Sequence, residues 1–524
     1  MNKRSNMRNK IIAPFLILMF IFSSFTSNTD DPVITKIIEE GLSGNQAMKH
    51  LDMLTNRFGG RLTGSVAYES AALWAAGKFR EWGMEVIMDE AGEVPVGFDR
   101  GPCFGKMLSE DGMILHFATP SYTVGTKGVQ RGHVVAEPKS QQEFDRMKGH
   151  LKGAWVLVTG ENDGYPVDWT KTGDHLRDSI INLNQEIVKK NEEIKKENTT
   201  NEGKKKAKEL IPMADAPALF YRQMVEAGIL GIIQSSSIPI KAMYDRKNLP
   251  FMSLAHLPAV PDIKLDKHQY SIISTKVMER QYVLLEFDIR NYFRPGPIKY
   301  HNVIGVIKGS DFPDELVIMG GHLDSYDVGS GASDNASGAV QAMEAARLIM
   351  ASGGKPKRTI LVCLWAAEEF GLLGSWSWIN RNEEKLGKIS NMFNWDSGPR
   401  VFSGIAVSDA MMEDMKKVCE PINSINPDFP FEVTRREPRP KPEKAWGTDS
   451  GPFAVKGVPT LNFSAGDAKG YNFDYMEIWH TERDEFSKII PEYVEHNAIV
   501  TAVVVYGVAH LDHPLSRDGY YLQP

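Results

Sequence analysis

The chain has 524 residues, of which 42% are hydrophobic and 24% are charged. This composition excludes a disordered protein, and the length is too great for one ordinary domain, so we expect two folded units around large cores. The formal net charge of −7 at pH 7 gives no case for nucleic-acid binding, because that needs a basic surface.

The N-terminus predicts a secretory signal peptide over residues 1–27. Residues 1–10 contain four basic side chains and no acid, and an apolar run follows from Ile11 to about Phe25. The run is short for a membrane span and contains Pro14. We expect a secreted or periplasmic protein with no membrane contact once the signal is removed; an uncleaved anchor is the alternative.

The next segments predict helices, then a strand, and then a region of short β-strands. Residues 37–60 and 65–90 have apolar residues at helical spacing and lead into a strand, and we assign residues 28–114 to the first part of a catalytic domain. Short β-rich runs follow, so residues 115–290 are predicted to form an inserted domain. Within it, the charged segment 182–210 is interpreted as a solvated helical excursion, with a ligand-binding patch as the alternative.

From residue 291 to residue 524 the pattern predicts the larger part of the catalytic domain. The apolar runs "NVIGVIKG", "ELVIMGG", "TILVCLWAA" and "ISNMFNWD" alternate with helical segments. Strands that are apolar throughout and separated by helices indicate an α/β fold, with a mixed, largely parallel sheet covered by helices on both faces. Ligands of such sheets gather at the carboxyl ends of the strands.

Ionisable residues follow several of these predicted strands. The glycine-rich loop "GGHLDSYDVGSGASDNASG" follows the second run, and the candidates at this and the other positions are His322, Asp324, Asp334, Glu368, Glu369, Asp396 and His480. Carboxylates and imidazoles without a thiolate suit zinc, or manganese or cobalt, in a catalytic site. The set is too large for one tetrahedral zinc, whereas two ions about 3.5–4 Å apart, sharing one carboxylate, would use it.

Each candidate taken alone has a structural explanation. Acids after apolar strands commonly cap helices, and paired acids before a helix complement its dipole. The three cysteines, Cys103, Cys363 and Cys419, lack the CxxC spacing of a zinc ribbon or redox site. The metal hypothesis therefore depends on the candidates recurring at successive strand ends of one domain.

These motifs resemble a known family. The stretch from "NVIGVIKG" to "SDNASGAV", with "AAEEFGLLGS", "NWDSG" and "HTERDEF", resembles the di-zinc aminopeptidase and carboxypeptidase family, peptidase family M28, and its plasma glutamate carboxypeptidase branch. Residues 59–79 resemble the N-terminal segment of that family. The resemblance implies the zinc exopeptidase fold, an inserted protease-associated-like domain and two Zn²⁺ per chain.

The resemblance also implies a role for each candidate. Asp334 would bridge both ions, His322 and Asp396 would complete one site, and Glu369 and His480 would complete the other. Glu368 would be the general base that activates the bridging water. Asp324 would orient His322, and Asp484 has a similar expected part. The chain departs from the family at Ser450, where a histidine is usual, which affects a substrate contact and no ligand.

The implied function is a secreted zinc exopeptidase, an aminopeptidase, dipeptidase or carboxypeptidase that hydrolyses dipeptides or short peptides. One alternative is a single-zinc acyltransferase of the glutaminyl cyclase type. Another is a non-catalytic, receptor-like relative, which substituted ligands would indicate. A sugar or phosphate ester hydrolase is weaker, because no phosphate-binding loop or nucleophile elbow is present. The expected binding partner is a short peptide substrate, and the sequence is compatible with a homodimer.

Overall fold

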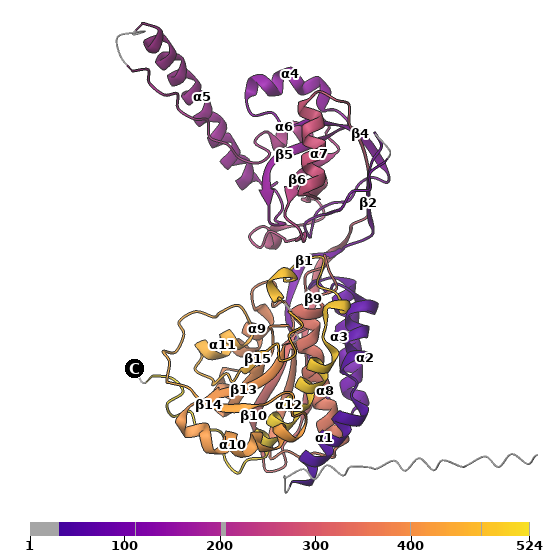
Figure 1. The fold of residues 1–524 in the computed structure, drawn as a ribbon, viewed down its shortest axis with the longest axis vertical. Helices are drawn as coiled ribbons and strands as arrows, with labels where there is room; N and C mark the ends of the chain where they lie inside the picture. Colours follow the sequence, from indigo (N-terminus) through magenta and orange to yellow (C-terminus); the bar gives the residue numbers. More distant parts are fainter. Residues whose placement is uncertain (1–30, 110–111, 201–205, 399, 473, 523–524) are drawn as a thin grey trace, which may run out of the picture.

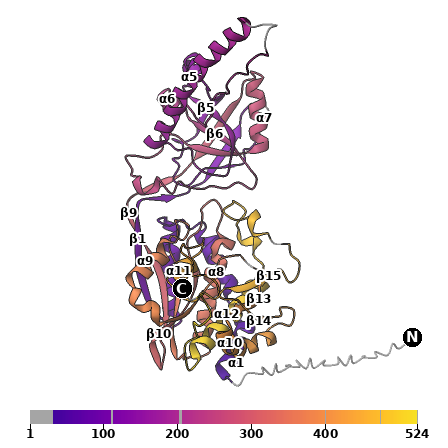
Figure 2. The same ribbon diagram turned by 90° about the vertical axis from the view of Figure 1, so that its left-hand side faces the viewer.

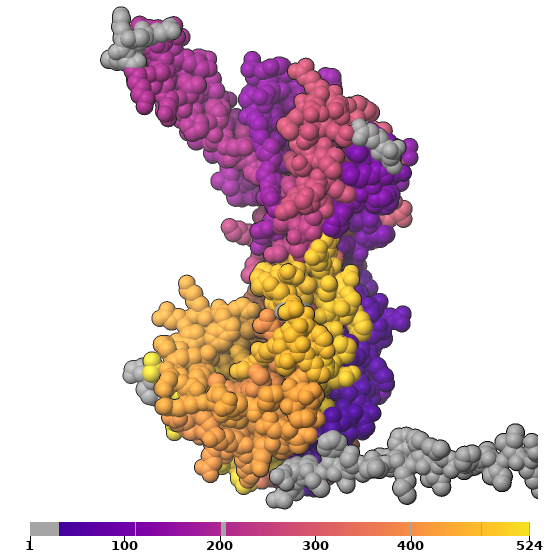
Figure 3. All heavy atoms as spheres, in the orientation of Figure 1, coloured from indigo at the N-terminus to yellow at the C-terminus, as the bar shows by residue number. Residues whose placement is uncertain are grey.

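The computed structural model describes residues 31–109, 112–200, 206–398, 400–472 and 474–522. The predicted signal peptide, residues 1–27, lies outside the described residues. The described chain forms two lobes, which Figures 1 and 3 show joined through a narrower waist. Two long antiparallel strands, β1 (Glu85–Asp99) and β9 (Tyr292–Ile307), run from one lobe toward the other.

The five-stranded lobe, residues 31–99 and 292–522, is built on a mixed sheet in the order β1-β9-β11-β10-β12. Three of its strands are parallel to one another: β11 (Arg358–Trp365), β10 (Phe312–His322) and the edge strand β12 (Ile389–Asn394). Every residue of β11 is buried, as expected for a strand covered on both faces. A small sheet of β13 (Val401–Val407), β14 (Glu432–Arg435) and β15 (Phe463–Gly466) lies in the same lobe.

Helices cover both faces of the five-stranded sheet. Alternate residues of β11 separate the two faces: Val362 belongs to a large core shared with the first set of helices, and Cys363 belongs to a smaller core on the opposite face. The first set comprises α1 (Pro32–Gly44), α2 (Ala47–Asp52), α3 (Val66–Glu81), α8 (Ser337–Ala351), α10 (Met412–Cys419) and α12 (Pro491–His510). The opposite face carries α9 (Leu373–Arg381) and α11 (Ser450–Val455). The predicted α/β fold class is therefore confirmed.

The seven-stranded lobe, residues 103–289, contains the second sheet. Its strands follow the order β2-β8-β4-β5-β6-β7-β3, and it begins at Cys103, before the predicted start of the inserted domain at residue 115. The strands are β2 (Cys103–Met107), β3 (Phe117–Ala118), β4 (Gln130–Ala136), β5 (Ala154–Asn162), β6 (Gly231–Ser236), β7 (Asp262–Asp266) and β8 (Leu284–Ile289). Helices α4 (Gln141–Leu151), α6 (Tyr221–Glu226) and α7 (Lys267–Met278) pack on this sheet; Figure 1 labels all three, and Figure 2 shows α6 and α7 from the side.

A long helix, α5 (Lys171–Thr200), projects from the seven-stranded lobe (Figure 1). Asn184, Asn191 and Asn198 each pair their side-chain amide with one residue of the returning chain, at Ala214, Ile211 and Lys208, through N···O distances of 2.7–2.9 Å. The asparagines are seven residues apart on the helix, a rise of about 10.5 Å, and their partners are three residues apart on the extended chain, which is nearly the same length. The helix and the returning chain can therefore pair at each of the three positions. Among the residues that the structure describes, no helix has the length and apolarity to cross a membrane.

Candidate metal centre

The candidate residues gather where the parallel strands of the five-stranded sheet end. His322 is the last residue of β10 and lies beside Trp365, the last residue of β11. Glu368 and Glu369 follow β11, and Asp396 follows β12. Because parallel strands end at the same edge, these residues meet there although up to 74 positions separate them.

Asp334 and His480 reach this edge from two other segments. Asp334 lies in a short turn, η3 (Ala332–Ala336), directly before α8, and its own φ of −120° and ψ of 90° are not helical. The turn starts at Gly331, whose φ of 59° places it in the left-handed region. A Cβ there would stand 2.2 Å from the Ser325 side chain, so only glycine fits. His480 follows the short 3₁₀ turn η7 (Tyr475–Glu477).

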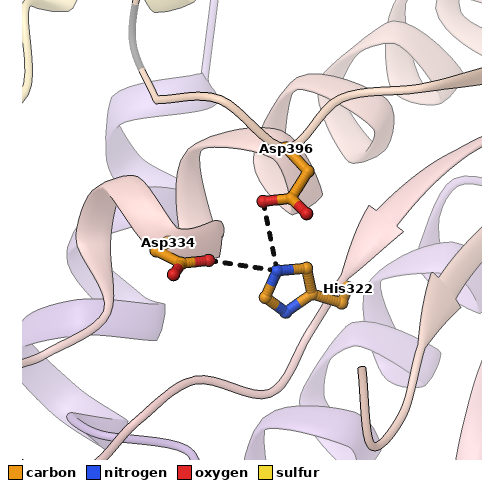
Figure 4. Close-up of side chains that lie close together, drawn as sticks. All are labelled: His322, Asp334 and Asp396. Atoms are coloured by element: carbon orange, nitrogen blue, oxygen red, sulfur yellow. Dashed lines mark hydrogen bonds and ion pairs between the residues drawn. The ribbon is translucent and has the colours of Figure 1, made fainter. Parts of the chain in front are cut away.

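His322, Asp334 and Asp396 form the first triad, which Figure 4 shows with both carboxylates facing one ring nitrogen. His322 Nε2 lies 3.2 Å from Asp334 Oδ1 and 3.3 Å from Asp396 Oδ1. Its other nitrogen, Nδ1, donates to the backbone carbonyl of Asp324 at 3.0 Å if that nitrogen carries the proton. This bond leaves the Nε2 lone pair directed at the carboxylates, as a metal ligand requires.

Asp334, Glu369 and His480 form the second triad. His480 Nε2 lies 3.1 Å from Asp334 Oδ2 and 3.1 Å from Glu369 Oε2. Asp334 therefore offers one carboxylate oxygen to each triad. Within each triad the ligand atoms lie within 4.8 Å of one another, and Glu369 Oε1 is buried without a hydrogen-bond partner. Two cations that share Asp334 would fit these donors.

Aromatic rings fix the orientation of His480. The Trp479 ring stacks on the imidazole at a centroid distance of 3.8 Å, and the Tyr326 ring lies 4.1 Å away. His480 has a positive φ of 59°, which is uncommon for a residue other than glycine and needs support from its surroundings.

The structure shows how Asp324 and Asp484 act on the triads. The Asp324 carboxylate stands 3.5 Å from His322 Nδ1, and it accepts hydrogen bonds from Thr63 Oγ1 at 3.0 Å and from the Glu368 backbone N–H at 3.2 Å. The bond to His322 comes from the Asp324 carbonyl. Asp484 accepts from the backbone N–H groups of Ser333 and Asp334 at 2.7 and 3.0 Å, so it fixes the turn that carries Asp334.

Carboxylates dominate the electrostatics of the site. Burial alone lowers the pKa of a histidine, yet the neighbouring carboxylates, Asp396 first, raise the pKa of His322 well above its usual range. In the same way Glu369 and Asp334 outweigh burial and raise the pKa of His480 to about 10. Burial raises the pKa of Glu369 to about 7 and that of Glu368 well above its usual range. The site thus holds more negative charge than its own cations balance, which is the condition for binding metal ions.

Arg61 supports the loop that carries the first ligands, and the sequence pattern did not single it out. The side chain is fully buried. Its nitrogens donate to five backbone carbonyls at 2.8–3.1 Å, those of Leu54, Gly59, Leu323, Ser330 and Gly331. The resemblance of residues 59–79 to the family's N-terminal segment was the signal that pointed to this region.

A cavity of about 980 Å³ opens beside both triads and is lined from both lobes. The five-stranded lobe contributes Asp334, Glu368, Glu369, Asp396 and His480, and the seven-stranded lobe contributes Tyr165, Pro166, Asp168 and residues 243–247. Glu368 is half-buried at its wall. The sequence analysis assigned no site residue to the inserted domain.

Two further positions concern the segment around Ser450. Ser450 is buried and accepts a hydrogen bond from Trp446 Nε1 at 3.3 Å. The neighbouring Asp449, which the sequence analysis missed, is also buried and accepts from Ser375 Oγ at 2.5 Å. Burial raises the pKa of Asp449 to about 8.

The chain is similar to known peptidases. Residues 302–505 match Peptidase family M28. Carboxypeptidase Q of Rattus norvegicus is 31% identical over 222 residues, which are 41% of this chain and 43% of the rat chain. The chain thus aligns with less than half the length of that relative. Carboxypeptidase Q of Xenopus laevis is 22% identical over 499 residues, covering 92% of this chain and 90% of the relative.

A solved structure shares the fold. The crystal structure of a peptidase M28 precursor from Shewanella amazonensis aligns with a TM-score of 0.55 and 22% identity, over 92% of this chain and 97% of that one. All five residues of the two triads fall within the matched range 302–505. Both triads thus lie in the part of the chain that is similar to peptidase family M28.

Proposed function

We propose that the protein is a zinc-dependent exopeptidase that hydrolyses dipeptides or short peptides. The observation that carries the proposal is the pair of triads sharing Asp334, next to Glu368 at the wall of a cavity. The family and the carboxypeptidase Q relatives support the reaction class.

The proposed ligands divide between two ions. His322 and Asp396 would hold one Zn²⁺, Glu369 and His480 would hold the other, and Asp334 would serve both. When bound, two such ions lower the pKa of water toward neutrality and polarise a peptide carbonyl. Imidazole and carboxylate ligands without thiolate suit zinc in a catalytic site.

Glu368 is the proposed general base. Its backbone N–H is fixed by the Asp324 carboxylate, whose other oxygen accepts from Thr63, so the residue starts from a rigid position. Its carboxylate faces the cavity beside Asp334 and Glu369. A half-buried carboxylate with a raised pKa is a suitable acceptor of the water proton, which it then gives to the leaving amine.

The cavity supports a short substrate. About 980 Å³ is at the upper end of the range typical of small-molecule sites. The seven-stranded lobe, which we take as the inserted domain, contributes Tyr165 and Met243 to the wall. A long polypeptide would have to pass between the lobes, whereas a dipeptide or a chain end is small enough for the cavity.

Metal analysis separates this proposal from its alternatives. The chain is expected to hold two Zn²⁺ after dialysis against a weak chelator. One ion, together with cyclisation of N-terminal glutamine and no released fragment, would support a glutaminyl-cyclase-type reaction instead. Two ions without hydrolysis of any peptide would support a receptor-like relative.

One dipeptide offered in three forms, free, N-acetylated and C-amidated, shows which terminus of the substrate the enzyme recognises. Loss of hydrolysis on acetylation would identify an aminopeptidase, and loss on amidation would identify a carboxypeptidase. Loss in both cases would identify a dipeptidase. Equal hydrolysis of all three forms would contradict an exopeptidase.

A further inference from the structure

The two triads differ in what holds them. His322 ends strand β10 and Asp396 follows strand β12 of the five-stranded sheet. The second triad instead depends on two loops, around Glu369 and around His480, and both loops contact residues 240–246 of the seven-stranded lobe. We call residues 240–246 the bridging segment.

The first contact is at Glu369. Tyr244, which is 3% exposed, donates its hydroxyl hydrogen to the Glu369 backbone carbonyl at 2.7 Å, and Arg246 donates to the same carbonyl at 3.0 Å. The Tyr244 ring also lies 4.7 Å from the ring of Phe370. The bridging segment therefore fixes the peptide group that follows the ligand.

This support matters because the turn around Glu369 has an unusual backbone. Ala367 and Leu372, on either side of it, have positive φ angles of 52° and 63°. Such angles cost roughly 1–3 kcal/mol in residues other than glycine and persist only where the surroundings enforce them. The Tyr244 hydroxyl is part of those surroundings.

The second contact is at His480. The backbone N–H of Glu482 donates to the Ile240 carbonyl at 3.0 Å, and the Ile240 N–H donates to Glu482 Oε1 at 3.2 Å. Lys241 Nζ stands 5.1 Å from the centroid of the Trp479 ring, which stacks on His480. The bridging segment thus pairs with the His480 loop along the backbone and supports it through a cation–π contact.

The first triad is held differently. In the described parts of the chain, the hydrogen bonds that reach the side chains of His322 and Asp396 come from the five-stranded lobe alone. Asp334, the shared residue, is fixed by Asp484 of the same lobe.

We propose that the bridging segment positions the second metal site selectively, with Tyr244 as its main positioning residue, so that the affinity for one of the two ions depends on the seven-stranded lobe. This inference rests on the proposed function, since it requires two bound ions. Its consequence is that contact between the lobes controls occupancy of the Glu369–His480 site while the His322–Asp396 site stays loaded.

The test is stepwise zinc binding to the full chain, measured by calorimetry and chelator competition. Tyr244→Phe removes one hydroxyl and should weaken binding of one Zn²⁺ about 10-fold, because loss of a partner behind a ligand typically costs 10–100-fold in metal affinity. Binding of the other ion should not change. The matched control is Tyr68→Phe, which removes an equally buried hydroxyl that donates to the His301 carbonyl at 2.8 Å and should change neither affinity.

Repeating the Tyr244→Phe substitution in two further variants shows which of the two metal sites it affects. In Asp396→Asn, where the first site is weakened, Tyr244→Phe should still lower the affinity of the remaining site. In His480→Ala, where the second site is lost, Tyr244→Phe should have no further effect. The reverse pattern, or equal weakening of both ions, would overturn the inference.

The remaining outcomes are also decisive. If the parent chain binds two ions and hydrolyses a dipeptide while Tyr244→Phe leaves both affinities unchanged, the inference fails and the proposed function stands. If the parent binds only one ion, both fail. Should Tyr244→Phe lower the Tm of the metal-free chain more than Tyr68→Phe does, Lys241→Met provides the same test from the His480 side, with an expected loss of roughly two- to fivefold for one ion only.

Discussion

The two lobes treat buried charge differently. In the seven-stranded lobe, the fully buried Lys264 ammonium lies 2.9 Å from an Asp262 carboxylate oxygen and 3.0 Å from the Gln234 side-chain oxygen, so the charge is balanced within the protein. At the strand ends of the five-stranded lobe, carboxylates outnumber the cationic groups, and Glu369 Oε1 has no partner. The Lys264–Asp262 pair needs no further charge, whereas the carboxylates at the strand ends need bound cations to balance them.

The largest expected effect tests whether the unbalanced carboxylates have different roles. Glu368→Gln keeps the shape of the side chain and removes its ability to accept a proton, so kcat should fall about 10²–10⁴-fold, or roughly 3–5 kcal/mol. The KM should change little, because proton transfer belongs to the transition state. Steady-state kinetics on a good dipeptide and a metal count would measure both.

The neighbouring residue provides the control. Glu369→Gln should weaken zinc binding, and excess zinc should restore part of its activity, because Glu369 is a proposed ligand. A Glu368→Gln protein that binds two ions and works at nearly the parent rate would show that Glu368 is not the base.

The second prediction removes Arg61, a fully buried cation of the five-stranded lobe. Arg61→Met should lower the free energy of unfolding by about 4 kcal/mol, because the Gly59, Leu323 and Ser330 carbonyls would lose the donor that Arg61 provides. Zinc affinity should fall with it, since Leu323 and Gly331 belong to the ligand loop. Urea unfolding of the metal-free chain would measure the loss. The exposed Arg290, paired with Asp288 at 2.8 Å, is the control for removing an arginine, and an equal loss in Arg290→Met would contradict this role.

The contrast between Arg61 and His322 shows what the sequence could predict. His322, Glu369 and Asp396 each follow an apolar strand, so a local pattern and the rule that ligands gather at strand ends were enough to group them. The same rule grouped Asp334, in the loop after β10, and His480, which was predicted to follow a strand. The structure instead places His480 after the turn η7 and Asp334 in the turn η3. The role of each candidate came from the resemblance. The metal hypothesis could thus be formed before any coordinates were known.

The supporting residues had no such local signal. Arg61 acts on carbonyls more than 260 positions away, and Tyr244 lies in a different lobe from the carbonyl it holds. Their partners are backbone groups, which leave no mark on the sequence. Asp324 was expected to orient His322 through its carboxylate, which lies 3.5 Å from His322 Nδ1. The Asp324 backbone carbonyl accepts from the same nitrogen at 3.0 Å, a contact that residue type does not predict.

The third prediction breaks the balanced pair of the seven-stranded lobe. Lys264→Met should lower the free energy of unfolding by about 3 kcal/mol, because it leaves the Asp262 carboxylate buried beside an apolar side chain. The zinc count and the kcat of the folded fraction should stay at the parent values. Loss of zinc in this variant would show that the two lobes do not separate structural charge from metal-binding charge.

The smallest expected effect concerns two histidines of the five-stranded lobe with opposite surroundings. The carboxylates of the second triad raise the pKa of His480 to about 10, whereas burial lowers the pKa of His496 to about 4. His496 is 4% exposed, lies beside the Phe429 ring, and neither of its ring nitrogens has a hydrogen-bond partner. Burial without carboxylates thus lowers the pKa of a histidine, so the raised value at His480 reflects the surplus of negative charge.

The sign of the pH effect at His496 follows from this difference. Its folded-state pKa of about 4 is below the usual 6.5, so between these values the unfolded chain binds more protons, and stability falls as the pH falls through that window. Between pH 7 and pH 5 this contribution is about 2 kcal/mol. His496→Leu should therefore lose less stability than the parent over that range, as measured by urea unfolding at each pH. An identical profile for His496→Leu and the parent would mean that His496 is protonated in the folded chain, and burial would then no longer explain the contrast with His480.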